Sequence, residues 1–204
     1  MSKQSIWNYL KTHTSLSDEA IAGIMGNFEA ESNNEACRVQ GDFTSDRRTS
    51  KDYANRVNTG IMTTSQFMND AKGWGLAQWT YNSRKLNLYK TCQSYCVGIE
   101  DESAQLAFFL AEMQMEHVST WNKLLNCHSI YDAASYVCCE YERPAVNNVA
   151  ARADYGNTIY KQFHGKDTTP DPELAPTPQP VPVDDDKTAK IISLLEQIIL
   201  LLKE

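Results

Sequence analysis

The sequence predicts a predominantly α-helical domain followed by a proline-rich linker and a final helix that self-associates. Of the 204 residues, 42% are hydrophobic and 22% are charged, a balance typical of a soluble domain with a core of its own. Apolar residues recur at helical spacing up to residue 164, and six of the seven prolines lie between residues 170 and 182. We therefore predict a domain over residues 1–165, an acidic linker over 166–186 and an amphipathic helix over 187–204.

The first strongly predicted helix begins after Ser17. This residue is a suitable N-cap, and Asp18 and Glu19 then fall in the first turn, where acidic side chains complement the helix dipole. An apolar stripe at i, i+3, i+4 and i+7 follows, made of Ile21, Ile24, Met25 and Phe28. Similar spacings predict further helices around Leu86, Tyr89 and Cys96; around Leu106, Phe109, Leu110 and Met113; around Trp121, Leu124 and Leu125; and around Ala133, Val137 and Tyr141.

Two segments complete the domain. We expect its last helix to start at Pro144 and to carry the apolar residues Val149, Ala153, Ile159, Tyr160 and Phe163. The polar segment over residues 37–64 lacks sustained periodicity, and we expect a long loop there. Loops of this length in compact domains are often functional.

Beyond the domain, alternating prolines predict an extended, solvated spacer, because proline locks φ and removes backbone donors. Three aspartates at 184–186 then offer an N-cap for the final helix. Its two seams at 3.5-residue spacing are Ile191, Leu194, Ile198 and Leu201, and Ile192, Leu195, Ile199 and Leu202. Two adjacent seams favour a trimer, a tetramer or a larger bundle. The alternatives are docking onto the domain and lying on a membrane, and a polar face that is not rich in Lys or Arg disfavours the membrane.

Charge and cysteine content exclude several classes of function. The net charge of −7 and the pI near 5.1 argue against general affinity for nucleic acid or anionic membranes. The N-terminus has no long apolar stretch after a basic start, so we expect neither a signal peptide nor a transmembrane helix, and synthesis in the cytoplasm. The six cysteines include no Cys-x-x-Cys pair, and no histidines stand at zinc-ligand spacing. We therefore expect free thiols, no metal and no cofactor.

Two carboxylates close the first core helix, in the segment Gly-Asn-Phe-Glu-Ala-Glu-Ser-Asn over residues 26–33. Cleavage of a glycosidic bond commonly uses one carboxylic acid to protonate the bridging oxygen and a second carboxylate. The acid needs a partly apolar site, so that it keeps its proton near neutral pH. On an ideal helix Glu29 and Glu31 flank opposite edges of the apolar stripe, so helical phase does not choose between them.

The segment Gly-Trp-Gly-Leu-Ala-Gln-Trp-Thr over residues 73–80 has the composition of a sugar-binding strip. Its glycines allow close backbone approach, Trp74 and Trp79 offer flat faces for sugar rings, and Gln78 offers an amide donor and acceptor. The alternative for the tryptophans is packing in a core. Asp70 is a candidate second carboxylate, with a turn or helix cap as its alternative. Weaker rivals in the predicted loop are Asp42, Asp46 and Asp52.

These residues resemble the phage tail-type lysozyme family over roughly residues 4–164. The matching elements, in order, are Gly26-Asn27-x-x-Ala30-Glu31-Ser32, Asp70-x-x-Gly73-Trp74-Gly75-Leu76-Ala77-Gln78-Trp79-Thr80, Arg84-Lys85 and Tyr141-Glu142-Arg143-Pro144-Ala145. The resemblance implies an α+β lysozyme-like fold, with Glu31 as the catalytic acid and Asp70 as its candidate partner. It places Gln78 against substrate. Further candidate substrate-binding residues are Ser32, Trp74, Trp79, Tyr81 and Tyr141. A Gly often follows Glu-Ser in the family, where this chain has Asn33. Glu142 could be a second catalytic group or the partner of Arg143 in a structural ion pair, and we favour the ion pair.

The resemblance further implies a muramidase that cuts the β-1,4 bond between N-acetylmuramic acid and N-acetylglucosamine in bacterial peptidoglycan. We expect an endolysin, held in the host cytoplasm until holin-type pores release it and then multivalent on the wall through its final helix. The alternatives are a lytic transglycosylase, a virion tail-associated lysozyme and a non-catalytic glycan-binding or assembly protein. A cysteine peptidase or amidase fits poorly, because no nucleophile motif surrounds any cysteine.

Overall fold

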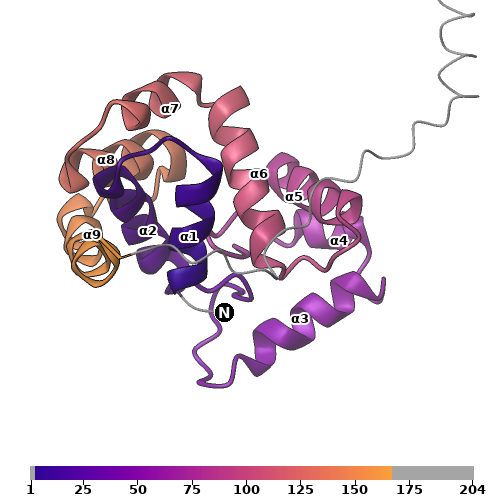
Figure 1. Ribbon diagram of the computed structural model, residues 1–204. Coiled ribbons are helices and arrows are strands. Elements are labelled where there is room, and N and C mark those ends of the chain that lie inside the picture. Colours follow the sequence, from indigo (N-terminus) through magenta and orange to yellow (C-terminus); the bar gives the residue numbers. More distant parts are fainter. Residues whose placement is uncertain (1–2, 167–204) are drawn as a thin grey trace, which may run out of the picture.

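The domain is built from helices in the computed structural model, which describes residues 3–166 (Figure 1). The predicted linker, apart from its first residue, and the predicted final helix lie outside the described residues. In chain order the elements are α1 (Lys3–His13), α2 (Asp18–Ser32), α3 (Arg48–Asn58), α4 (Thr64–Asn69), α5 (Asn82–Ser94), α6 (Glu102–Met115), α7 (Val118–Leu125), α8 (Ile130–Tyr136), the π-helical turn η1 (Val137–Glu142) and α9 (Val149–Phe163). The predominantly α fold is thus confirmed for these residues.

We call α2 the central helix because α1, α8 and α9 pack against it. Its start is the one that the sequence predicts. Ser17 adopts an extended backbone and its side chain accepts a hydrogen bond from the Ala20 amide, as an N-cap does. The predicted stripe of Ile21, Ile24, Met25 and Phe28 is fully buried in the core. Both predictions are confirmed, because capping and a 3.6-residue period are properties of the local sequence.

Small residues let α8 and α9 approach α2 closely. A Cβ at Gly26 would collide with the carbonyl oxygen of Arg152 and lie 2.9 Å from the Gly156 nitrogen, while a Cβ at Gly156 would lie 2.8 Å from the carbonyl oxygen of Ala22. At Gly23 an added Cβ would lie 2.5 Å from the Ala133 Cβ. The backbones of three helices therefore meet behind the C-terminal half of α2, which carries Glu31.

The segment over residues 37–64 corrects the expectation of one long loop, because α3 lies within it. Its buried residues Ser50, Tyr53, Ala54 and Val57 stand at i, i+3, i+4 and i+7, but a serine and a tyrosine in that stripe weaken the apolar signal. The start of the last helix was also predicted wrongly. Asn148, not Pro144, precedes α9, and its side chain accepts a hydrogen bond from the Ala151 amide.

The β component is minimal. Residues 3–166 contain no β-strand, only the isolated antiparallel bridges Val39–Trp74 and Trp74–Trp79. No helix among the same residues has the length and apolar character needed to cross a membrane. The six cysteines are free thiols, and Cys92, Cys127 and Cys138 are buried.

Candidate functional site

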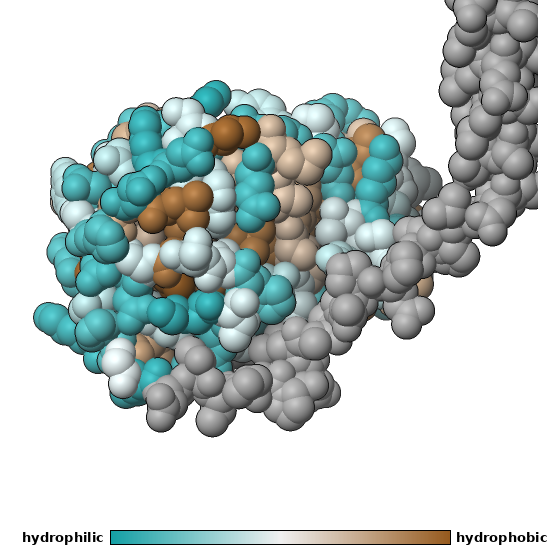
Figure 2. Space-filling model, turned by 45° about the horizontal axis from the view of Figure 1, so that its top comes forward, coloured by the Kyte–Doolittle hydropathy of each residue, from teal (hydrophilic) through white to brown (hydrophobic). Residues whose placement is uncertain are grey.

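Surface hydrophobicity does not mark a site by itself. On the face that Figure 2 shows, hydrophilic residues predominate and the hydrophobic ones form small separate groups. A polar hollow is more informative. It encloses about 570 Å³, within the usual range for small-ligand pockets. The residues that line it are Glu31, Gln40, Gly73, Ala77, Gln78, Thr80, Tyr81, Arg84, Glu142, Arg143, Pro144 and Ala145.

A tight turn over residues 73–80 forms one wall of this pocket. The backbone amides of Trp74 and Trp79 donate to each other's carbonyl oxygens at 3.2 and 3.0 Å. Gly75 has a φ of 75°, a conformation that side chains other than glycine disfavour. The buried side chain of Gln105 accepts a hydrogen bond from the Leu76 amide at 2.9 Å, which anchors the turn to α6.

Ser32 connects this turn to the end of α2. Its hydroxyl lies 2.9 Å from the Leu76 carbonyl oxygen and 3.0 Å from that of Phe28, and it is 2% exposed. The Glu-Ser pair therefore has a physical explanation, since the buried serine holds the turn beside the carboxylate that precedes it. The structure places Ser32 behind the pocket wall, and it is not one of the residues that line the pocket.

Glu31 lines the pocket and Glu29 does not. The Glu31 carboxylate accepts a hydrogen bond from Arg152 on α9 at 2.6 Å, and the same guanidinium donates to the side chain of Asn27 at 3.0 Å. Glu29 instead pairs with Lys3 at 2.7 Å. Tertiary contacts thus distinguish the two carboxylates that helical phase leaves equivalent.

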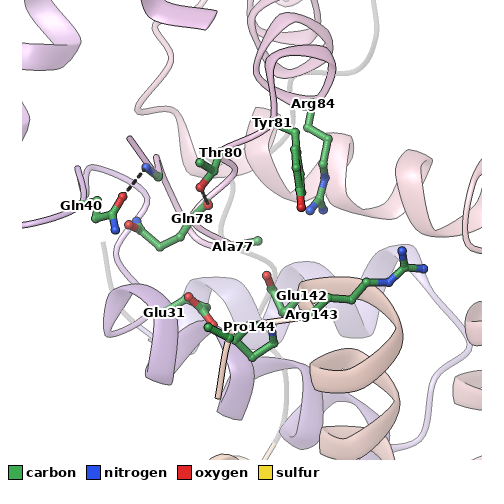
Figure 3. Close-up of a pocket in the computed structure, with 12 residues that line it drawn as sticks. Glu31, Gln40, Ala77, Gln78, Thr80, Tyr81, Arg84, Glu142, Arg143 and Pro144 are labelled. Atoms are coloured by element: carbon green, nitrogen blue, oxygen red, sulfur yellow. Dashed lines mark hydrogen bonds between the residues drawn. The ribbon is translucent and has the colours of Figure 1, made fainter. Parts of the chain in front are cut away.

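Gln78 faces the pocket with a fixed amide. Its Nε2 donates to the carbonyl oxygens of Arg38 at 3.1 Å and Gly75 at 2.9 Å, which leaves Oε1 as an acceptor. At Gly73 an added Cβ would lie 2.8 Å from that Oε1, so the glycine makes room for the amide. Figure 3 shows Gln78 across the pocket from Glu31. The nearby Gln40 accepts a hydrogen bond from the Gly73 amide at 3.1 Å.

The aromatic residues of the predicted site divide into buried and exposed. Trp74 and Trp79 are each 0% exposed and Tyr141 is 2% exposed, so none of these rings offers a face to a ligand. The two indole nitrogens donate to the Ile99 carbonyl oxygen at 2.9 Å and to the Tyr141 hydroxyl at 3.0 Å, respectively. Tyr81, in contrast, is 73% exposed and lines the pocket, which makes it the aromatic side chain available for stacking.

A buried ionic cluster supports the wall near Tyr81. Glu112, which is 3% exposed, accepts hydrogen bonds from Arg84 at 2.7 Å and from the Tyr141 hydroxyl at 2.6 Å. The guanidinium of Arg84 also lies 4.4 Å from the centre of the Tyr141 ring. Tyr141 therefore positions Arg84, and Arg84 presents positive charge at the pocket.

Asp70 does not line the pocket. It is the C-terminal cap residue of α4 and lies 2.5 Å from Nζ of the fully buried Lys85, while the Tyr53 hydroxyl donates to it at 2.6 Å. Burial acts to raise the pKa of Asp70, but the hydrogen bonds from Lys85 and Tyr53 outweigh it and keep the pKa below its usual range. The weaker rival Asp42 accepts hydrogen bonds from Ser50 and Thr44 near the start of α3, also outside the pocket lining.

Replacing Asp70 with Asn is expected to lower stability by about 1–2 kcal/mol at neutral pH, because Lys85 then lacks its counter-ion. Since the native pKa of Asp70 is depressed, its contribution is present at neutral pH and is lost as the pH falls through that pKa. The difference between wild type and variant should therefore shrink below about pH 4. Urea unfolding at several pH values measures it. The folded variant should cleave glycan at the same rate as wild type. A large loss of activity would show that Asp70 takes part in catalysis.

Two polar groups of the pocket, Gln40 and Glu142, are not among the predicted site residues. Gln40 lies in a segment without periodicity, so no pattern marked it. Glu142 stands in the noted Tyr-Glu-Arg-Pro element, but the expected ion pair between these two described residues, Glu142 and Arg143, does not form. The Arg143 guanidinium instead donates to the Glu140 carbonyl oxygen at 3.0 Å. Among residues 3–166 no cluster of His, Cys, Asp or Glu could hold a metal ion.

The pocket of this helical domain contains carboxyl groups, a fixed amide and an exposed aromatic ring, and a pair of carboxyl groups is what glycosidase chemistry commonly uses. Comparison with protein families agrees with that chemistry. The model of the family described as phage tail lysozyme matches residues 2–163, and the chain belongs to this family. A search of curated proteins found no match.

Proposed function

We propose that the protein is a phage endolysin, a muramidase that hydrolyses the β-1,4 bond between N-acetylmuramic acid and N-acetylglucosamine, with Glu31 as general acid. The observation that carries this proposal is the position of Glu31, opposite the fixed amide of Gln78 in one open pocket. Membership of a lysozyme family supplies peptidoglycan as the substrate class.

Gln78, Tyr81 and Glu31 have different roles in this mechanism. Oε1 of Gln78 accepts a hydrogen bond from an acetamido N–H or a sugar hydroxyl, and the exposed ring of Tyr81 stacks on a pyranose face. The carboxyl group of Glu31 donates its proton to the bridging oxygen as the C1–O bond breaks. Water then adds its oxygen to C1 and returns a proton to the enzyme, which completes hydrolysis.

Mass spectrometry of digested cell walls tests the reaction directly. Muramidase action predicts fragments that end in reducing N-acetylmuramic acid. Ends carrying a 1,6-anhydro ring would instead identify a lytic transglycosylase, in which the muramic acid hydroxyl replaces water. Intact glycan strands after long incubation with folded protein would overturn both enzymes and leave a glycan-binding or assembly role.

The proposal also states where the enzyme acts: it is released from the host cell and is not carried in the virion. An endolysin that passes through holin-type pores from the host cytoplasm and a virion tail-associated lysozyme would share the same pocket chemistry. The family description names the tail form, so the virion is the place to test. Detection of the protein in purified virions would identify the tail-associated form. Recovery in the lysate but not in virions is expected for the endolysin.

Self-association through residues 187–204 is proposed from the sequence pattern, since these residues lie outside the described part of the structure. Deleting residues 184–204 is expected to lower the mass measured by light scattering three-fold or more, if the two apolar seams assemble a trimer or a larger bundle. Cleavage of small soluble glycan fragments should persist in the shortened protein, whereas clearing of whole walls should slow because multivalency is lost. A monomeric full-length protein would contradict the assembly.

A further inference from the structure

The end of η1 has an unusual backbone that places Glu142 in the pocket. The Arg143 amide donates to the Cys138 carbonyl oxygen at 2.8 Å, an i+5 to i bond that widens the helix. Arg143 itself has a φ of 50°, which is uncommon for a residue other than glycine. Single π-helical turns of this kind frequently occur at functional sites. This one ends at a glutamate that lines the same pocket as Glu31.

The carboxyl group of Glu142 has no neutralising contact. Its side chain is half-buried, its Oε1 is enclosed, and that oxygen has no hydrogen-bond partner among the described residues. An ionised carboxylate in such a position loses hydration without compensation, so the protonated form is favoured. Glu31 differs in this respect, because Arg152 lies 2.6 Å from it. One pocket therefore holds two carboxyl groups, of which one has a counter-ion in contact and the other has none.

Charges from four elements act on Glu142. Burial raises its pKa well above the usual range, and the negative charge of Glu31 on α2 adds to this rise. Arg84 on α5 and Arg152 on α9 act in the opposite direction, and Glu112 on α6 raises the pKa further. The balance favours the protonated form of Glu142 beside a charged Glu31.

We propose that Glu142 is the second catalytic carboxyl group of this pocket, and that Glu31 and Glu142 hold one proton between them for delivery to the glycosidic oxygen. This inference rests on the proposed function. It supplies the second carboxylate that glycoside hydrolysis commonly uses, a role for which Asp70 lies outside the pocket lining.

The proton balance of the step is complete. The shared proton passes to the bridging oxygen from the carboxyl group of Glu31, and the C1–O bond breaks with its electron pair on that oxygen. Both carboxyl groups are then ionised, and their charges stabilise the positive charge that develops at C1. Water bonds to C1 through its oxygen and gives one proton back to the pair, which restores the singly protonated state.

The variant Glu142→Gln tests the inference, because glutamine has nearly the shape of a protonated glutamate but cannot donate a carboxylic proton. We expect kcat on soluble glycan fragments to fall by about 10²–10⁴-fold, with wall binding and the melting temperature close to wild type. Glu140→Gln is the matched control. It lies on the same turn but pairs with Lys123 at 2.6 Å, away from the pocket lining, and its activity should stay within about two-fold of wild type.

A titration gives a second readout that does not require activity. With ¹³C-labelled glutamate, the Glu142 carboxyl carbon should titrate at lower pH in Glu31→Gln than in wild type, because a neighbouring negative charge has been removed. An unchanged titration would overturn the shared proton, even if Glu142→Gln failed to fold. An active Glu142→Gln beside an inactive Glu31→Gln would overturn this inference and leave the proposed function standing. Full activity in both variants would overturn the proposed function itself.

Discussion

Replacing Glu31 with glutamine is expected to abolish wall cleavage while the protein stays folded. The substitution keeps the size of the side chain, and its amide oxygen can still accept the hydrogen bond that Arg152 donates at 2.6 Å. Only the carboxylic proton is lost. General acid catalysis typically contributes 10²–10⁴-fold, so we expect a loss of about that size in the clearing of wall suspensions and in the release of reducing ends.

Glu29→Gln is the matched control for this variant. Glu29 is on the same helix, two residues away, but it contacts Lys3 and Asn34 and does not line the pocket. Its activity should remain within about two-fold of wild type, since substitutions away from a functional site have small effects. Equal losses in both variants would show that the end of α2 matters for folding and not for proton transfer. An active Glu31→Gln would remove Glu31 from the mechanism.

Replacing Gly26 with alanine is expected to have the largest effect on stability. Alanine favours a helix by about 1 kcal/mol over glycine, but the added Cβ would collide with the Arg152 carbonyl oxygen and lie 3.2 Å from the Cα of Gly156. Both obstacles are backbone atoms of α9, which cannot rotate away. Since α2 and α9 would have to separate, we expect a net loss of about 3 kcal/mol or more in the free energy of unfolding. Activity should fall as well, because Arg152 contacts Glu31.

Gly41→Ala separates this collision from the intrinsic cost of replacing a glycine. Gly41 has a φ of 82° and nothing within 4 Å of an added Cβ, so only the conformational cost of about 1 kcal/mol applies. Urea unfolding of both variants measures the difference. If Gly26→Ala were no less stable than Gly41→Ala, the close approach of α2 and α9 would be wrong.

Local patterns predicted α2 well and α3 poorly, for a physical reason. The cap at Ser17 and the stripe of four large apolar residues in α2 depend on neighbours within two turns. The buried stripe of α3 includes Ser50 and Tyr53, whose burial depends on partners outside the helix. Asp42 accepts a hydrogen bond from the Ser50 hydroxyl at 2.6 Å, and the rings of Trp74 and Tyr53 stack with their centroids 5.1 Å apart. Such partners leave no trace in the spacing of apolar residues.

The amino-acid sequence was sufficient for the helical class of the domain, for the core face of its central helix and for the motifs that mark the family, because these depend on short-range order or on the motif itself. Which residues line the pocket depends on the tertiary structure alone. Glu31, Gln78 and Glu142 come from segments far apart in the chain and meet at one cavity, while both predicted tryptophans turn into the core. Whether a carboxyl group gains a counter-ion, as Glu31 does, or is buried without one, as Glu142 is, depends on which distant side chains pack beside it.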